Sequence, residues 1–291
     1  MKFTAAFFPS LFLAMSCQGQ TVFQYDLSQP DLVHQLPPIL NEVSGLTNID
    51  NNHVALIQDE LGIVFLYDFS EGKIVSQHQF ESTGDFEGLA YADNKMYILR
   101  SDGRLTEWNN FPDQAKSVKH YDLNLPTSNN EGLCYDPKHN RVLIAAKSKP
   151  DHGYEKSRRL IYAFDLLTRK LLNKPLYSLN VDRLAEKAHS LGIEQSNLTE
   201  KGKQKPFNFR PSSLAIHPLT GDLYIISAVD FLMVVMNPSG KIIHMEPLEP
   251  ERFPQAEGLT FLPDGTMIIT SEAAGKVPTL QVFKMKMQGD H

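Results

Sequence analysis

Short apolar runs alternate with polar turns along most of the chain, and this alternation repeats five times. Each unit begins with a short motif that ends in Gly-Leu or Ser-Leu. The five motifs are Glu42–Leu46, Asp85–Leu89, Asn129–Leu133, Arg210–Leu214 and Gln255–Leu259. After each motif comes a turn rich in Asp, Asn, Pro or Gly, and then an apolar run such as Val54–Ile57. Two apolar runs joined by a tight turn predict paired β-strands.

The units recur at a nearly constant spacing. The interval is 43 residues from Ser44 to Glu87, 44 from Glu87 to Glu131, and 45 from Ser212 to Glu257. Third and fourth strands are visible in the first unit at 62–67 and 73–75. A four-stranded unit repeated every 40–50 residues or so is typical of β-propellers. The sequence therefore predicts an all-β fold, a five-bladed β-propeller of four-stranded antiparallel blades, as one domain over residues 21–286.

The ring needs a strand from the N-terminal side to close it. The last unit runs out after Thr279–Lys284 and lacks an outer strand, whereas the strand-like segment Thr21–Leu27 precedes the first unit and has no place in it. We expect this N-terminal strand to complete the last blade, because closure removes an open sheet edge that would invite aggregation.

The third unit carries an insertion of about 37 residues, since 81 residues separate Glu131 from Ser212. Within it, Leu184, Ala188 and Leu191 recur at helical spacing, which predicts one helix near the start of the insertion, 181–206. A lysine-rich polar stretch follows. A lid, a partner-docking element and a solvated loop are all compatible with this pattern.

The first residues are typical of an export signal. Lys2 supplies a positive charge, and Phe3–Met15 is an almost uninterrupted apolar stretch, shorter than a membrane span. Small residues precede Cys17, which resembles the lipid-modified cysteine of bacterial lipoproteins. We therefore expect a signal peptide over 1–17, lipidation of Cys17, and a cell-envelope location, periplasmic or on the cell surface, held to the membrane by the lipid alone. Export without a lipid and an uncleaved anchor stay open.

Composition narrows the function classes. Hydrophobic residues make up 42% and charged residues 21% of the chain, which is ordinary for a globular protein. The net charge of −6 argues against nucleic acid as a partner, because phosphate binding needs a basic face. With Cys17 lipidated, Cys134 stands alone, so we expect a small buried hydrophobe there and no disulfide.

The candidate chemistry lies at the start of the repeated units, because the first strand of each propeller blade lines the central axis. Residues two apart on a strand share a face, so the motifs predict two stacked rings at one channel mouth. The outer ring is Glu42, Asp85, Asn129, Arg210 and Gln255, and the inner ring is Ser44, Glu87, Glu131, Ser212 and Glu257.

Carboxylates that converge in this way raise each other's pKa or recruit a cation. The predicted ligands are oxygen donors alone, Glu42, Asp85, Glu87, Asn129, Glu131 and Glu257. Such a set favours Ca²⁺, which binds six to eight oxygens in tolerant geometry, over Zn²⁺. Two alternatives stay open: the carboxylates hold neighbouring blades in register, or two of them act as a catalytic acid and base.

The second strand of each blade ends on the same face and adds further polar residues. We assign Asp59, Glu60, Arg100, Lys147 and Glu272 there, together with Arg210 and Gln255 of the outer ring, to ligand binding. The basic members, Arg100, Lys147 and Arg210, would either bind an anionic group beside the metal or form salt bridges inside the ring.

Several of these segments resemble the SdiA-regulated, or YjiK-type, β-propeller family. The segments are Glu42–Leu46 with Asp59-Glu60, Ser212–Gly221, Phe253–Thr260, Pro263–Thr266 and Ser271-Glu272. The resemblance spans roughly residues 35 to 285 and implies an extracytoplasmic, membrane-associated bacterial propeller linked to calcium. Ala256 stands where the family usually has Pro.

These observations favour a calcium-binding envelope lipoprotein that acts as a binding, sensing or scaffold module, with an envelope protein as a possible partner. The alternative is a Ca²⁺-dependent hydrolase of a lactone, ester or phosphoester, with its site at the channel mouth, by analogy with other propellers. A scaffold that docks proteins through its rim or its insertion is a third reading. The sequence contains no motif that names a reaction.

Overall fold

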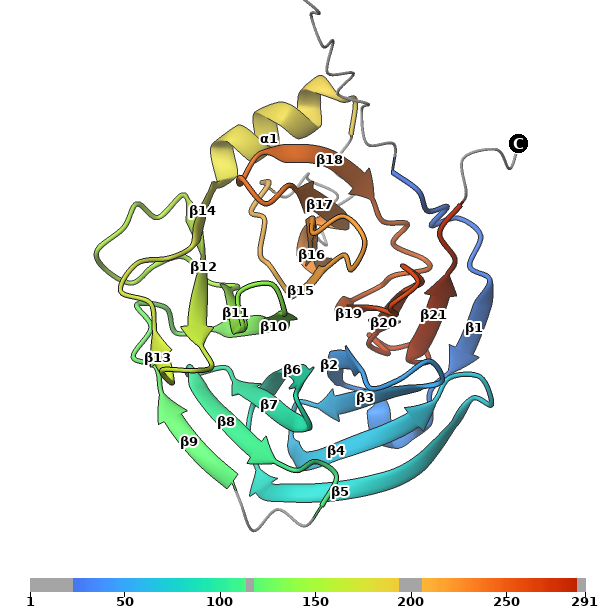
Figure 1. The fold of residues 1–291 in the computed structure, drawn as a ribbon. Coiled ribbons are helices and arrows are strands. Elements are labelled where there is room, and N and C mark those ends of the chain that lie inside the picture. The colour runs from blue at the N-terminus through green and yellow to red at the C-terminus, as the bar shows by residue number, and fades with distance from the viewer. Residues whose placement is uncertain (1–22, 114–117, 194–205, 287–291) are drawn as a thin grey trace, which may run out of the picture.

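The computed structural model describes residues 23–113, 118–193 and 206–286. They form five small antiparallel sheets arranged in a ring, as predicted (Figure 1). The first blade contains β2 (Val43–Asn48), β3 (His53–Gln58), β4 (Leu61–Asp68) and β5 (Lys73–Thr83), and the second contains β6 (Phe86–Ala92), β7 (Lys95–Arg100), β8 (Arg104–Asn109) and β9 (Val118–Asp122).

The third blade contains β10 (Asn130–Asp136), β11 (Arg141–Ala146), β12 (Arg158–Asp165) and β13 (Lys170–Leu171), and β14 (Tyr177–Asn180) pairs with the other half of β12. The fourth contains β15 (Ser213–Ile216), β16 (Leu223–Ser227), β17 (Leu232–Met236) and β18 (Ile242–Pro247), and the fifth contains β19 (Ala256–Phe261), β20 (Met267–Ser271), β21 (Thr279–Phe283) and β1 (Leu32–Gln35).

An N-terminal strand closes the ring, but it is not the predicted one. The outer strand of the last blade is β1, which pairs antiparallel with β21 from Leu32 opposite Val282 to Gln35 opposite Thr279. The prediction of a strand over Thr21–Leu27 is wrong for its described part, residues 23–27. Tyr25 and Leu27 are buried between the fourth and fifth blades, so their alternation reflects side-chain packing and not a ladder of backbone hydrogen bonds.

The core consists of five apolar layers, one between each pair of neighbouring blades. Ile57 and Phe86 belong to the layer between the first two blades, and Leu46 and Ile268 to the layer between the last and the first. Trp108, Tyr97 and Tyr224 are buried in these layers. Each blade thus buries both faces, which explains why the second strands are almost wholly apolar.

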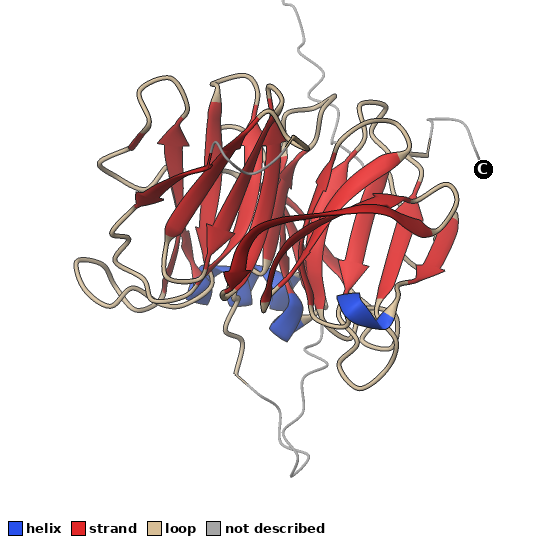
Figure 2. Ribbon diagram, turned by 90° about the horizontal axis from the view of Figure 1, so that it is seen from below, coloured by secondary structure: helices blue, strands red, loops and turns tan. Residues whose placement is uncertain are grey.

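The helical segments lie on one face of the disc (Figure 2). They are η1 (Pro38–Leu40), α1 (Val181–Ser190) and η3 (Ala228–Asp230). The predicted helix in the insertion is therefore present, with Asn180 capping its first turn through a hydrogen bond from the Arg183 N–H. Leu184 and Ala188 are buried as expected, but Leu191 lies beyond the helix and is 54% exposed.

The first strands of the blades approach each other very closely around the axis. A β-carbon on Gly88 would lie 2.7 Å from the Glu131 carbonyl oxygen, and one on Gly45 would lie 3.0 Å from the Gly88 α-carbon. Only glycine tolerates such contacts, which is why Gly follows the inner-ring residue in four of the five motifs.

Candidate functional site

A β-bulge points the inner-ring side chains at the channel. In four blades the pairing of the first two strands skips one residue, and the skipped residues are Ser44, Glu87, Glu131 and Glu257. A bulge turns the extra residue away from the regular alternation. The repeat therefore sets both the position and the direction of the inner ring.

The two serines of the inner ring fasten blades together. The Ser44 hydroxyl donates to the Phe86 carbonyl at 2.6 Å, and the Ser212 hydroxyl donates to the Ala256 carbonyl at 2.8 Å, in each case on the next blade. Holding neighbouring blades in register, the alternative role given above to the carboxylates, is thus a role of the two serines. The three glutamates have different partners.

Lys147 lies between two of these glutamates. Its Nζ is 2.5 Å from a Glu131 carboxylate oxygen and 3.4 Å from a Glu257 oxygen. All three side chains are at least 85% buried, since their exposed fractions are 15%, 4% and 7%. Burial opposes the charge on Lys147, but the charges of Glu257 and Glu131 outweigh it and raise the lysine pKa. Lys147 is thus a built-in counterion of the inner ring.

One lysine does not balance the charge of the mouth. Burial raises the pKa of Glu87 to about 9, and the nearby charges of Glu131, Asp85 and Glu257 add to the shift. Burial also raises the pKa of Glu131 to about 7, although Lys147 opposes the change. The third carboxyl group of the inner ring therefore carries a proton at neutral pH.

A second acidic cluster adjoins the first. Burial raises the pKa of Glu272 to about 8, assisted by Glu257 and Asp59, and raises that of Asp59 to about 6, assisted by Glu42. We call the whole set the carboxylate mouth; it contains Glu42, Asp59, Asp85, Glu87, Asn129, Glu131, Lys147, Glu257 and Glu272.

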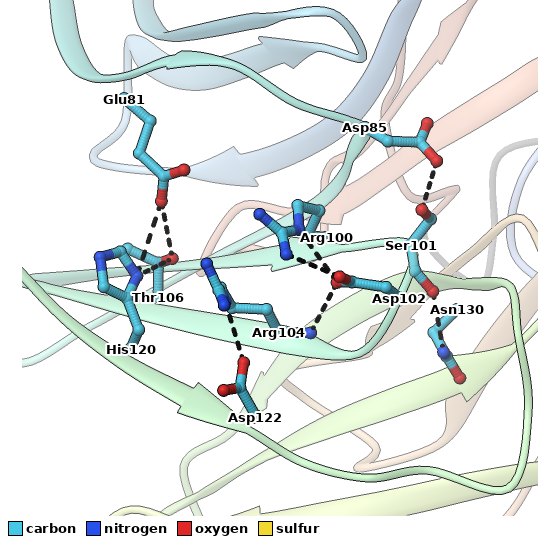
Figure 3. A network of polar contacts seen from close by, with 10 residues as sticks. All are labelled: Glu81, Asp85, Arg100, Ser101, Asp102, Arg104, Thr106, His120, Asp122 and Asn130. Carbon is cyan, nitrogen blue, oxygen red and sulfur yellow. Dashed lines mark hydrogen bonds and ion pairs between the residues drawn. The ribbon is translucent and has the colours of Figure 1, made fainter.

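The side chains of the outer ring do not all converge on the channel, as the prediction of a complete ring implied. Glu42 and Asp85 are exposed, and Asp85 accepts a hydrogen bond from the Ser101 hydroxyl (Figure 3). Asn129 hydrogen-bonds Glu131, and Gln255 donates to Glu257 at 3.3 Å, so these two amides support the inner ring.

Three predicted residues lie apart from the carboxylate mouth. Arg100 turns back to Asp102, with Nη2 to Oδ2 at 2.6 Å and Nε to Oδ1 at 3.0 Å, and therefore belongs to a local ion pair of the second blade (Figure 3). Glu60 is exposed, and its charge contributes to the raised pKa of the neighbouring Asp59. Arg210 lines a pocket at the side of the mouth.

This side pocket has a volume of about 470 Å³ and combines both signs of charge. Lys147, Arg210, Asp230, Gln255 and Glu257 contribute its polar walls. Sequence reasoning assigned no role to Asn208 or Asp230, which both line this pocket. Asp230 holds Asn208 through the backbone N–H at 3.0 Å, and Asn208 in turn accepts from Arg159. Asp230 follows the second strand of its blade, as Asp59 and Glu272 do, which is the signal that could have marked it.

The donor chemistry of the mouth suits a hard cation. Its ligand atoms are carboxylate and amide oxygens, and two of them, Asp59 Oδ1 and Asn129 Oδ1, are buried without a hydrogen-bond partner. Among the residues that the structure describes, however, no three acidic, histidine or cysteine side chains are arranged to hold a metal ion. Since the Lys147 ammonium already contacts Glu131 and Glu257, an added cation would compete with it for those oxygens.

The predictions for the N-terminus fall outside the described residues, which begin at Phe23, so the structure does not describe Cys17 or the apolar stretch before it. In the described part of the chain, none of the helices has the length and hydrophobicity needed to cross a bilayer. Cys134 is buried and unpaired, and burial raises the pKa of its thiol, as expected for a small core residue.

Comparison with known proteins connects this arrangement to one family. The family described as SdiA-regulated matches residues 22–276. No curated protein matches the sequence. Among solved structures, the glutaminyl cyclase of Myxococcus xanthus is similar, with 14% identity, a TM-score of 0.56, and coverage of 89% of this chain and 96% of that one.

Two further structures show weaker similarity. A nidogen/laminin complex has 13% identity and a TM-score of 0.48 over 81% of this chain and 78% of that one. A streptogramin B lyase has 12% identity and a TM-score of 0.47 over 86% and 97%. At such identities the glutaminyl cyclase supports the propeller fold alone.

Proposed function

The chain belongs to the SdiA-regulated family, and from the charges at its channel mouth we propose that it is a cation-binding module of the cell envelope, with Ca²⁺ as its preferred ion. The observation that supports the proposal is the excess of carboxyl groups over basic groups at the channel mouth. Seven carboxyl groups of the carboxylate mouth face one lysine, and four of them, on Glu87, Glu131, Glu272 and Asp59, have raised pKa values.

A divalent cation would relieve this repulsion more effectively than protons do. Glu87 and Glu272 make no ion pair with Lys147 at 4 Å or less, so both are available to a metal without breaking an existing contact. Asp59 Oδ1 and Asn129 Oδ1 offer two further oxygens that lack a partner in the protein. Ca²⁺ suits this set because it accepts carboxylate and amide oxygens in variable numbers.

The test is thermal unfolding of the mature protein in Ca²⁺, in Mg²⁺ and in chelator, combined with calorimetric titration. At a Ca²⁺ concentration of about 100 times the dissociation constant, binding adds ~2.7 kcal/mol to the free energy of unfolding. The double variant Glu87→Gln/Glu272→Gln should lose most of that gain. Glu186→Gln, which removes an exposed carboxylate from α1, is the matched control and should keep it.

A melting temperature that does not move between chelator and about 10 mM Ca²⁺ would refute this function, because a ligand that binds only the native state must stabilise it. An equal response in the double variant would refute the assignment of the residues.

We further propose that Cys17 carries the lipid that tethers the module to the membrane. What supports this is the order of a positive residue, an apolar stretch and a cysteine after small residues. Metabolic labelling with a fatty acid should mark the wild-type protein and not Cys17→Ser, which should leave the membrane fraction. Labelling of Cys17→Ser would contradict the assignment.

A second function has one observation in its favour, the side pocket beside the carboxylate mouth. Lys147 and Arg210 could hold an anionic substrate there, next to Glu257 as a candidate base. A bound Ca²⁺ would polarise an ester or phosphate oxygen. A panel of lactones, aryl esters and phosphomonoesters, assayed with Ca²⁺ and with chelator, tests this function. Activity that is indifferent to both chelator and Glu257→Gln would exclude it.

A further inference from the structure

Four leucines, one on the first strand of each of four blades, form a layer next to the inner ring. Leu46, Leu89, Leu133 and Leu259 each lie two residues after an inner-ring position, and all four are at most 4% exposed. On one side of this layer lies the carboxylate mouth. On the other side, where the first and second strands of the blades are joined, lies a hollow of about 930 Å³ whose lining includes these four leucines. We call it the distal pocket.

The distal pocket combines an apolar floor with aromatic walls. Tyr91, Tyr135 and Phe261 contribute to its lining, and Leu219 stands at its edge with 58% of its surface exposed. A volume of this size with mainly apolar walls is typical of sites for small molecules.

His217 lies in one wall of the distal pocket, and its imidazole is neutral. Its Nδ1 accepts hydrogen bonds from the Leu219 and Thr220 N–H groups, so its Nε2 carries the proton and donates to the Tyr25 hydroxyl at 2.8 Å. Tyr25 donates onward to the Gly265 carbonyl at 2.6 Å. Burial lowers the pKa of His217. Although His217 stands next to the turn between two strands, its exposed fraction is only 1%.

The charged residues of the distal pocket have an excess of positive charge. Asp136 is its one carboxylate, and it contacts Arg141 Nε and His139 Nδ1 at 2.8 Å each. Lys138 is exposed beside them and makes no ion pair within the described part of the chain. Two strong bases against one acid stand out in a chain whose net charge is −6. Asp93 and Asp222 also lie near the lining residues Tyr135 and His217, so a ligand with an acidic group would find its complement at Lys138 and repulsion at the opposite mouth.

We propose that the distal pocket binds an amphipathic anion, with an alkyl or similar apolar body on the leucine floor and its acidic group at Lys138. The apolar floor gives the binding free energy, and the exposed lysine gives the preference for negative charge. The site is independent of the cation function, because none of the residues that line the distal pocket belongs to the carboxylate mouth.

The experiment compares three probes of one chain length, namely dodecanoate, dodecanol and dodecyltrimethylammonium, by calorimetry or by displacement of a fluorescent anilinonaphthalene sulfonate. Dodecanoate should bind with the highest affinity and the ammonium with the lowest. Lys138→Glu should weaken dodecanoate by about fivefold, the scale of one exposed charge pair, and leave dodecanol unchanged. Leu219→Ser should weaken both.

Both variants change exposed side chains, so they preserve the fold. Their matched controls are Lys170→Glu and Leu167→Ser, which change an exposed lysine and an exposed leucine away from the pocket and should bind like wild type. Three results would each overturn the proposal: no saturable binding of dodecanoate, equal binding of the ammonium probe, or variants that bind as their controls do. Glu87→Gln should leave dodecanoate binding unchanged, which separates this site from the carboxylate mouth.

Discussion

Glu87 provides a sensitive test of the electrostatics of the carboxylate mouth. Its pKa rises from 4.5 to about 9, because the group is buried and lies near the charges of Glu131 and Asp85. Between these two values the folded protein keeps a proton that the unfolded chain has lost. Stability must therefore fall as the pH rises through this window, with the loss beginning near pH 4.5 and complete above pH 9.

The magnitude follows from the width of the window. Each pH unit costs at most ~1.4 kcal/mol, so the cost at pH 7, 2.5 units above the ordinary pKa of 4.5, is at most ~3.5 kcal/mol. Glu87 is only partly buried, and solvent and salt screen its neighbours, so we expect about half of this limit. Gln has the shape of a protonated Glu and does not ionise in the unfolded chain. Glu87→Gln should therefore stabilise the protein by ~1–2 kcal/mol at pH 7 and have little effect at pH 5.

Urea unfolding at pH 5, 6, 7 and 8 in the presence of chelator measures this difference directly. The matched control is Glu60→Gln, an exposed carboxylate on the same rim, which should change the stability by less than ~0.5 kcal/mol at every pH. A Glu87→Gln variant that is less stable than wild type at pH 7 in chelator would refute the reasoning, because it would mean that the charged form of Glu87 is favourable. Added Ca²⁺ should reverse the order, since only the wild type retains this ligand.

Two further predictions concern single contacts. Lys147→Met leaves Glu131 and Glu257 buried without their counterion and should cost ~3–5 kcal/mol at pH 8 by urea unfolding. The cost should be distinctly less at pH 5, where Glu131, whose pKa burial raises to about 7, takes up a proton; a cost that does not depend on pH would contradict the ion-pair assignment. Tyr25→Phe removes the hydroxyl shared by His217 and Gly265 and should cost ~1 kcal/mol, whereas no loss of stability would show that this contact does not anchor the N-terminal segment.

The sequence predicts the blades well because each blade is local. Two strands, a turn and two more strands lie within about 45 residues, so period and turn residues suffice to find them. Closure of the ring joins the two ends of the chain, and no local signal distinguishes the two possible segments. Phe23, Tyr25 and Leu27 alternate as a strand would, yet Leu32–Gln35 provides the backbone pairing.

The sequence predicted where the charged residues of the candidate site lie along the chain, but not which of them form ion pairs. The two basic residues do not stand at equivalent points of their blades. Arg100 is the last residue of the second strand, whereas Lys147 follows its strand; the residue equivalent to Lys147 is Ser101, because the N–H groups of both donate to outer-ring carbonyls. Arg100 has an aspartate two residues ahead in a tight turn and pairs with it, whereas Lys147 has Ser148 and Lys149 there and reaches across the axis instead. The nearby Asp102 was the signal that Arg100 would stay in its own blade.

The single lysine also explains why the ring is asymmetric. Five equal glutamates on one axis would repel each other too strongly to be buried together, and two of the five positions are serines that bond to the backbone of the next blade. Of the three glutamates left, two share Lys147 and the third, Glu87, keeps a proton. A cation that replaced this proton would act at the one position of the inner ring where the protein supplies no counterion of its own.

Affinity for a cation should therefore increase with pH, because deprotonation of Glu87 creates the ligand. A calorimetric titration at pH 6 and pH 8 checks this direction, and equal affinities at both values would mean that Glu87 takes no part in binding.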